Sequence, residues 1–432
     1  MRWFWFVSLI ILTGLLALTL GQPLILVAVF ILFDMLISRK VNWFFWIPEK
    51  MKKIPGWINL LVWVLFTVTF LRLLVVDSIT VLSPGMRPAM QTGDNILISK
   101  IHFGPRLPIT PLNFPLSHHY LPLSRCKPSY IRSVTLPCRR LDGFSSLQRG
   151  DLVAYNFPEG DSSICGAELT SYYALRRKKE NEGDSISKTF LRYRPLDRRE
   201  PEVSRCIGLP GDTVSILLAK VKNQSYRDPL KARISLDYLI EVSNRQLPEQ
   251  LLKRLDLAQS EIQIFPGLGY LIPLRPDQLI EFRQRPEVKA MSPFQIDPDK
   301  GDFNIFPHLS TFPWNRDNFG PVIVPGKGDI IKLSPVNLPF YRRIIEVYEK
   351  NHLEVEGERI LINNEVTTSY VFKQNYYFVL GDNRHHSRDS RHWGFLPEDH
   401  IIGKPILIWF SAMKAPDQSL KIKWNRIFTI PI

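Results

Sequence analysis

The first 76 residues of this 432-residue chain are mostly apolar, and the pattern of hydrophobic and polar positions changes sharply after them. Apolar runs with few charges cover residues 3–20, 23–38 and 57–76. Runs of roughly 20 such residues are long enough to cross a lipid bilayer as helices. We therefore predict a membrane anchor of three helices in residues 1–76.

The charges around these runs predict their orientation. A cleaved signal peptide is the alternative for the first run, but Arg2 is the only charge before it and no small-residue cleavage motif precedes the second run. The loop at 39–56 holds five basic residues and one acidic residue, which is typical of a cytoplasmic loop. The third helix would then deliver the rest of the chain to the extracytoplasmic side of the membrane, as in a multi-pass protein.

Beyond residue 76 the pattern is that of a mainly β domain. A Gly-Asp pair precedes a short apolar or β-branched stretch at four places: Gly93-Asp94, Gly150-Asp151, Gly211-Asp212 and Gly328-Asp329. Glycine and aspartate suit turns, and the residues that follow them have strand propensity. Two further apolar stretches, 353–355 and 360–362, flank Glu356-Gly357 and predict a hairpin.

Helices are expected at only two places outside the anchor, because 34 prolines are spread along the chain. One covers residues 339–350, with Asn337 as its N-cap, and the other covers residues 248–257. Residues 101–145 are rich in proline and arginine, so we expect an extended segment without regular structure there.

Residues 219–320 differ from their surroundings, with longer polar stretches and mixed helix and strand signals. We interpret them as a mixed α/β insertion or second subdomain. The β domain would then consist of two parts, residues 77–218 and residues 321–432.

Composition and charge narrow the function classes. The chain carries 55 Lys and Arg against 41 Asp and Glu, a net charge of +14, and 45% of its residues are hydrophobic, which excludes an intrinsically disordered chain. A basic face toward anionic lipid is favoured over nucleic-acid binding, because no aromatic–basic nucleic-acid motif is present. The four cysteines show no metal-ligand spacing; Cys126 and Cys138 either form a disulfide or are free thiols.

Four segments stand out by their residue pattern: 83–94, which begins Ser83-Pro84-Gly85-Met86; 150–158; 204–214, which begins Ser204-Arg205; and 381–404, which begins Gly381-Asp382-Asn383-Arg384. Together they resemble the sequence boxes of bacterial type I signal peptidase, serine peptidase family S26. The last box is long and nearly intact, so the resemblance is specific. With residues 219–320 included, the chain looks like a long-insert branch of that family.

The resemblance implies a β-rich protease on the outer face of the bacterial inner membrane that removes signal peptides from exported proteins without a cofactor. The family uses a serine nucleophile and a lysine general base. Serine is a poor nucleophile unless a base takes its proton. A lysine can act as that base only where burial lowers its pKa enough to leave it neutral.

This chain departs from the family pattern at both of those positions. The first box reads Ser83-Pro84-Gly85-Met86, so Gly85 stands where the resemblance places the nucleophilic serine. The other box reads Ser204-Arg205, so Ser204 stands where it places the lysine. We therefore expect a catalytically inactive member of the family.

The other functional positions of the family are present. The resemblance implies that Ser83 supplies the oxyanion-hole hydroxyl, although this serine could merely end a strand. It also implies that Met86 lies beside the substrate pocket and that Ser387 orients the base. Four charged residues complete the supporting set: Arg205, Asp382, Asp389 and Arg391, the last two as an ion pair.

Substitute catalytic residues are the main alternative. Ser83 lies two positions before the nucleophile, which in a strand keeps the face but shifts the hydroxyl by about 6–7 Å. Lys100 and His386 are conceivable bases, but no sequence pattern indicates that Lys100 is buried. The pair His385-His386 has no metal partner at useful spacing and is expected to lie in a solvated loop.

Three functions remain open at this stage. The first is a catalytically lapsed relative that still binds signal peptides or a partner such as an active paralogue or the export machinery. The second is an active signal peptidase with a rearranged nucleophile and base. The third is a structural membrane subunit whose pocket has collapsed.

Overall fold

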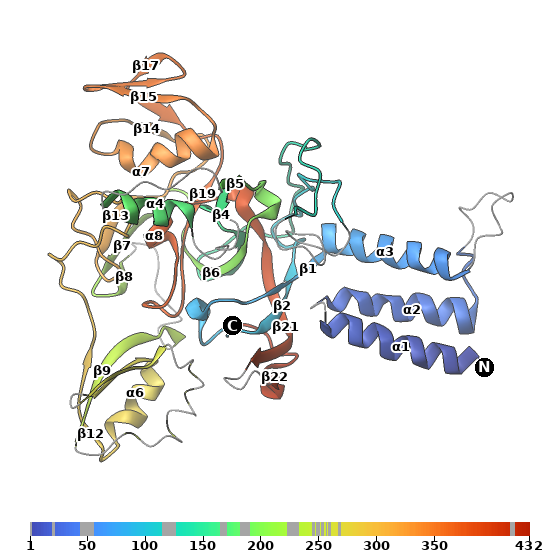
Figure 1. Cartoon of the computed structure of the whole chain (residues 1–432). Helices are drawn as coiled ribbons and strands as arrows, with labels where there is room; N and C mark the ends of the chain where they lie inside the picture. Colours follow the sequence, from blue (N-terminus) through green and yellow to red (C-terminus); the bar gives the residue numbers. More distant parts are fainter. Residues whose placement is uncertain are drawn as a thin grey trace.

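The computed structural model describes residues 2–19, 22–43, 56–114, 127–164, 171–181, 191–222, 233–243, 247, 251, 255, 257, 261–266, 269–414 and 420–432. The N-terminal helical segments lie side by side and extend from the rest of the molecule (Figure 1). They are α1 (Arg2–Thr19), η1 (Pro23–Leu26), α2 (Val27–Phe33), η2 (Asp34–Ser38) and α3 (Gly56–Leu74).

The helices fall where the sequence predicts them, but the membrane anchor is not supported. Over the ranges that the structure describes, no helix is both long enough and apolar enough to pass through a bilayer. The second apolar run is divided into three short segments, and α2 itself has only 7 residues. Asp34 helps to end this run, because its carboxylate accepts hydrogen bonds from the backbone N–H groups of Lys40 and Val41.

The main sheet is antiparallel and has eight strands, which confirms the mainly β prediction. Its order is β1-β2-β21-β3-β6-β19-β20, with β22 paired to β21. The strands are β1 (Val76–Thr80), β2 (Asp94–Ser99), β3 (Leu152–Asn156), β6 (Pro201–Gly208), β19 (Tyr376–Leu380), β20 (Leu396–Pro397), β21 (Ile401–Lys414) and β22 (Leu420–Ile422). All four predicted Gly-Asp turns are followed by strands, here β2 and β3 and, outside this sheet, β7 (Thr213–Leu217) and β14 (Ile330–Lys332).

Strand β3 is buried on both faces and separates two parts of the core. Leu152 and Ala154 pack into a cluster that also contains Met86. Val153 and Tyr155 point to the opposite face and pack into a cluster that contains Trp393. This alternation follows from the two-residue period of a strand. It places Met86 of the first box on one face of β3 and Trp393 of the last box on the other.

A third core cluster joins β7 to the C-terminal half of the chain. Its elements are β8 (Lys220–Lys222), β13 (Phe319–Ile323), β18 (Ser369–Val371), α7 (Leu338–Arg343) and η9 (Ile344–Tyr348), with β15 (Leu353–Glu356), β16 (Arg359–Ile362) and β17 (Glu365–Thr367) beside them. The predicted hairpin is confirmed as β15 and β16. The helix predicted at 339–350 is confirmed as α7 and η9. Asn337 stands at the N-cap position of α7 as predicted, but its side chain accepts from the backbone N–H of Ser334 and makes no capping hydrogen bond to the helix.

Within the predicted insertion, a separate four-stranded sheet has its own core. It consists of β9 (Leu236–Val242), β10 (Gln263–Phe265), β11 (Gly269–Leu274) and β12 (Val288–Pro293), and it carries α6 (Pro276–Arg283). In Figure 1 this sheet lies away from the N-terminal helices. The helix predicted at 248–257 falls largely outside the described residues.

The remaining elements are short: β4 (Ser162–Ile164), β5 (Leu191–Tyr193), α4 (Tyr172–Asn181), α8 (Ser390–Trp393), η4 (Pro84–Met86), η6 (Leu196–Arg198), η10 (Glu398–His400) and η11 (Trp424–Arg426). The described part of 101–145 has no helix or strand, as predicted, and is tied down by isolated bridges such as Arg106 to Arg140. Cys138 is a free, exposed thiol, and Cys126 lies outside the described residues.

Candidate functional site

A pocket of about 230 Å³ lies between the end of β1, the 3-10 turn η4 and the first half of β6. We call it the groove. Five of the predicted site residues line it: Ser83, Gly85, Met86, Ser204 and Ser387. Segments more than 100 residues apart in the sequence therefore meet here. The four predicted charged residues lie behind the groove and not in its lining.

Gly85 is buried in the middle of η4, and its backbone carbonyl accepts a hydrogen bond from the N–H of Asn383 at 3.0 Å. A Cβ atom at this position would lie 3.2 Å from the Cα and 3.3 Å from the Oγ of Ser387. Such contacts are tighter than most real Cβ contacts, so Ser387 would have to move by a few tenths of an ångström. The glycine thus lets the last box approach the first box more closely than a serine would.

Gly381 completes this contact from the other side. A Cβ atom on it would lie 2.1 Å from the Oγ of Ser387 and 2.5 Å from the carbonyl oxygen of Gly85. No side chain fits there without a shift of the backbone. Gly85, Gly381 and Ser387 therefore form one tightly packed unit at the floor of the groove.

Ser204 lies on β6 opposite Val153 of β3 and is buried. Its Oγ lies 3.0 Å from the Oη of Tyr155, a partner that the sequence reasoning missed. Tyr155 lies two residues along β3 from Val153 and is therefore diagonal to Ser204, a position from which side chains on the same face of two antiparallel strands can still touch. Burial raises the pKa of Tyr155 well above its usual value, so the phenol stays neutral. Ser204, at which the resemblance predicts the general base, thus meets a second neutral hydroxyl group and not an amine.

The groove also contains one ion pair that the sequence reasoning did not foresee. The guanidinium of Arg388 donates to the carboxylate of Glu202 at 2.5 Å. Burial raises the pKa of Glu202, and the nearby Arg388 only partly offsets this shift. Glu202 and Ser204 share a face of β6, since alternate residues of a strand point the same way. That alternation is the sequence signal that could have placed Glu202 in the groove.

Behind the groove, two buried ion pairs tie the boxes together, and we call them the framework pairs. Arg205 binds Asp382 through two hydrogen bonds of 2.8 and 2.6 Å. Arg391 binds Asp389 through two hydrogen bonds of 2.8 and 2.7 Å. The side chains of this second pair are 1% and 0% exposed, and Asp389 also accepts from the N–H of Gly381.

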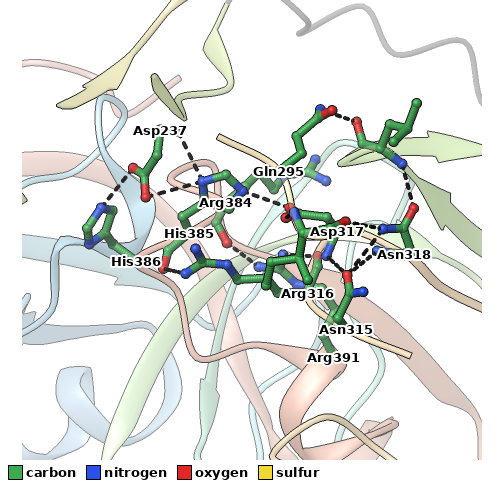
Figure 2. Close-up of polar contacts among 12 residues, drawn as sticks. Asp237, Gln295, Asn315, Arg316, Asp317, Asn318, Arg384, His385, His386 and Arg391 are labelled. Atoms are coloured by element: carbon green, nitrogen blue, oxygen red, sulfur yellow. Dashed lines mark hydrogen bonds and ion pairs between the residues drawn. The ribbon is translucent and has the colours of Figure 1, made fainter. Parts of the chain in front are cut away.

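The histidine pair of the last box does not lie in a solvated loop, which corrects the prediction (Figure 2). The His385 ring is fully buried, and its Nε2 lies 2.7 Å from the Asp317 carboxylate. Its Nδ1 accepts from the backbone N–H of Asp237 at 3.0 Å and lies 3.3 Å from the carboxylate of the same residue. Burial lowers the pKa of His385, but the hydrogen bonds to Asp237 and Asp317 raise it, and the net shift is upward. His386 lines the groove, and its Nε2 lies 3.0 Å from Asp237. The sequence could not indicate this burial, because Asp237 comes from β9, about 150 residues away in sequence.

Lys100 is not available as a base in the groove. Its ammonium group is largely buried, and it donates to the backbone carbonyl of Arg72 at 2.7 Å and to Asp77 at 2.9 Å. It lines a different pocket, formed by the first half of β1 with Asp77 and Ser78, and not the groove. Within the ranges that the structure covers, no cluster of three or more histidine, cysteine or acidic side chains is arranged to hold a metal ion.

Comparison with known proteins agrees with the resemblance seen in the boxes. The chain is 52% identical over 87 residues to a signal peptidase I of Aquifex aeolicus, covering 20% of this chain and 33% of the relative. It is 44% identical over 64 residues to the signal peptidase I of Haemophilus influenzae, which covers 15% of this chain and 18% of the relative. It is 30% identical over 106 residues to the signal peptidase I of Leptolyngbya laminosa, which covers 19% of this chain and 52% of the relative. The matched segments thus span from about a fifth to about half of the length of these relatives.

The family model described as "Signal peptidase, peptidase S26" matches residues 54–244 and 335–410. The two matched segments contain all four boxes and every residue that lines the groove. The unmatched stretch between them overlaps most of the predicted insertion. By the extent of this match, the chain belongs to the signal peptidase family, peptidase S26.

Proposed function

We propose that this chain binds the signal peptides of exported proteins in the groove and does not cleave them. One observation carries the proposal: the two positions that meet in the groove, Gly85 and Ser204, hold neither a nucleophile nor a base. Losing the nucleophile of a serine protease lowers turnover on the order of 10⁶-fold, and losing the base as well adds little. The hydroxyl of Ser204 is moreover engaged with Tyr155.

The strands around the groove support peptide binding. Strand β1 is at the edge of the main sheet, so its outer backbone groups have no strand beside them in that sheet. Strand β6 pairs with β19 only from Arg205 onward, which leaves its first half open on the side that lines the groove. An extended peptide can therefore add its backbone to both strands, as in β-strand addition.

The open volume of the groove also bears on the alternative of a collapsed structural subunit. That alternative requires an occluded space where Gly85 and Ser204 meet, whereas these residues line a pocket of about 230 Å³. Part of the lining of this pocket is apolar, with Ile79, Met86 and Met90 among its residues. Such a surface suits a small apolar side chain of a bound peptide.

Association with the bacterial inner membrane, with the groove outside the cytoplasm, belongs to the same proposal. It is supported by the apolar surface of α1, where Trp3, Phe4 and Trp5 are 61%, 70% and 58% exposed. Exposed apolar surface of this kind typically contacts lipid or protein. Flotation of the full chain with vesicles, before and after a high-salt wash, tests this part of the proposal.

The second candidate is an active signal peptidase with a rearranged site, and one observation favours it. His386 lines the groove and is hydrogen-bonded to Asp237, as the histidine of a Ser-His-Asp triad is to its aspartate. The hydroxyl would have to come from Ser83 or Ser387. Cleavage that is lost in His386→Gln and in one of the two serine-to-alanine variants would establish this candidate.

The test compares two forms of the purified full chain in detergent. The natural chain is incubated with a preprotein that bears a signal peptide, beside the double variant Gly85→Ser/Ser204→Lys. We expect the natural chain to bind the preprotein without cutting it, and the double variant to cut it. The single variant Gly85→Ser is the matched control, because it has the nucleophile but lacks the base.

Two results would contradict the proposal. Cleavage by the natural chain would show that the site is active and would favour the second candidate. No measurable binding of any signal peptide by the natural chain would remove the binding role. If the double variant does not cut, the tight packing around Ser387 is the first cause to test. The experiment is then repeated with Ser387→Gly added, because this change removes the contacts of Ser387 Oγ and Cβ with the new serine.

A further inference from the structure

The charged residues that line the groove carry more negative than positive charge. Two carboxylates, those of Glu200 and Glu202, lie in the lining with one guanidinium, that of Arg388. The carboxylate of Glu200 lies 3.3 Å from the guanidinium of Arg194, which is outside the lining. Glu202 and Arg388 are therefore the charged pair that a ligand in the groove meets.

Part of the Glu202 carboxylate is open to the groove. Its Oε1 accepts from the guanidinium of Arg388 at 2.5 Å, whereas Oε2 accepts from no described residue and is not closed off from solvent. The side chain as a whole is 21% exposed. The guanidinium of Arg388 is itself held over the ring of Phe157, 4.0 Å from its centre. The groove thus leaves room for a further donor at Glu202 beside Arg388.

Two pKa shifts indicate which charge this place favours. Burial raises the pKa of Glu202, Arg388 offsets this only in part, and the carboxylates of Glu200 and Asp389 raise it further. Burial lowers the pKa of Arg388, but Glu202 and Glu159 raise it, and the net shift is upward. The carboxylate therefore lacks positive charge around it, while the guanidinium already has negative charge around it. An additional cation is favoured over an additional anion.

The position of Glu202 on β6 determines where this charge would lie on a bound peptide. Glu202 and Ser204 share one face of the strand and lie about 6–7 Å apart along it. A peptide that adds to β6 as an extended strand presents every second side chain to that face. If one of these side chains lies beside Ser204, the next lies beside Glu202.

We propose that Glu202 recognises a lysine or arginine side chain of the peptide in the groove, two positions from the residue beside Ser204. This inference rests on the proposed function and adds a preference to it. Opposite charges that face each other across two strands attract, and an ammonium or guanidinium group can donate directly to Oε2. The preferred ligand is therefore an extended segment with a small apolar residue and a basic residue two positions from it.

The test compares fluorescein-labelled peptides that differ at one position. The host is the carboxyl-terminal part of a signal peptide with a single alanine after its apolar segment. The residue two positions before or after this alanine is lysine, glutamine or glutamate. Binding to the purified full chain in neutral detergent is followed by fluorescence anisotropy. At one of the two positions, we expect the lysine peptide to bind about fivefold or more tightly than the glutamine peptide, and the glutamate peptide to bind most weakly.

The overall charge of the chain predicts the reverse order. The net charge is +14, so non-specific attraction favours the glutamate peptide. A preference for lysine therefore has to come from a local acidic group.

Two variants of Glu202 show whether this residue is responsible. Glu202→Gln should remove the difference between the lysine and glutamine peptides. The matched control is Glu358→Gln, which removes the same charge from the exposed turn between β15 and β16 and should keep the difference. Glu202→Lys should reverse the order, so that the glutamate peptide binds most tightly. This reversal keeps the test sharp if Glu202→Gln folds poorly, because unfolding cannot produce it.

Three results would overturn the inference, and they bear differently on the proposed function. Equal binding of the lysine and glutamine peptides at both positions removes the preference and leaves peptide binding in place. A lysine preference that Glu202→Gln and Glu358→Gln reduce equally places the recognition elsewhere on the chain. No binding of any of the peptides removes both the preference and the proposed function.

Discussion

Positions 85 and 204 in the groove and the framework pairs behind it differ in how they treat polar groups. In the framework, Arg205–Asp382 and Arg391–Asp389 are charged, buried and joined by two hydrogen bonds each. In the groove, Gly85 has no side chain, and Ser204 offers one neutral hydroxyl to Tyr155. The two regions lie next to each other in sequence, since Ser204 directly precedes Arg205.

This difference separates the residues of the family pattern that the fold requires from those that only the reaction requires. Breaking a buried ion pair leaves an uncompensated charge, so the fold requires the framework pairs whether or not the site reacts. A hydroxyl or amine in the groove is required only by the reaction. The framework pairs of the last box are therefore expected to persist for the fold, whereas under the proposal the residues at positions 85 and 204 decide the activity.

The largest expected effect breaks the framework. Asp389→Ala leaves the buried guanidinium of Arg391 without its carboxylate and should lower the free energy of unfolding by about 3–5 kcal/mol. Ser387→Ala, which removes a half-buried neutral hydroxyl in the groove, should change it by about 0.5 kcal/mol or less. Urea unfolding followed by tryptophan fluorescence measures both. Equal losses would mean that the groove and the framework are energetically one unit.

The next effect concerns the stability of the protein in acid, through the buried side chain of His400. Burial lowers the pKa of His400 to about 4, and Arg199 donates to its Nε2 at 2.9 Å, which requires a neutral ring. Because the pKa in the unfolded chain is near 6.5, the stability is present above that pH and is lost as the pH falls toward 4. The loss is about 3 kcal/mol at most. His400→Gln should flatten this part of a plot of unfolding free energy against pH.

His385 should behave in the opposite sense and is the matched comparison. Its pKa is raised, so its contribution is fully present below pH of about 6.5 and is lost as the pH rises through the folded value. His385→Gln should therefore change the slope above that pH and leave the acid limb in place. If His400→Gln and His385→Gln both change the acid side of the plot of unfolding free energy against pH, then His385 does not bind an additional proton in the folded protein.

A smaller effect tests the hydroxyl pair in the groove. Tyr155→Phe leaves the buried hydroxyl of Ser204 without its partner and should cost about 1 kcal/mol of unfolding free energy. Ser204→Ala should cost a similar amount. The double variant should cost clearly less than the sum, because both partners are then removed. Additive losses in denaturant unfolding would show that the two hydroxyls do not interact.

The smallest expected effect probes the packing of Gly85. Gly85→Ala places a methyl group 3.2–3.3 Å from Ser387 and should cost about 1 kcal/mol by overpacking. Adding Ser387→Gly should recover part of that loss, because it removes two of the three close contacts. Thermal unfolding of the four forms in this cycle measures the coupling. No cost for Gly85→Ala would mean that the floor of the groove yields easily and that a serine fits without further change.

The sequence alone determined the features that depend on neighbouring residues. Strands follow each Gly-Asp turn, and a hairpin forms around Glu356-Gly357, because turn chemistry and strand propensity act over a few positions. The boxes indicated the family, and the same boxes predict that Gly85 and Ser204 depart from its pattern. None of these inferences requires knowledge of what packs against the segment.

Only the tertiary structure decided the features that depend on distant partners. His385 is buried because Asp237 and Asp317 reach it from other parts of the chain, and Tyr155 meets Ser204 across two strands. Lys100 has the right chemistry for a base but lines a different pocket, where it is paired with Asp77. Burial, pKa and hydrogen-bond partners are set by contacts between residues far apart in sequence, and local pattern carries no information about which of those contacts form.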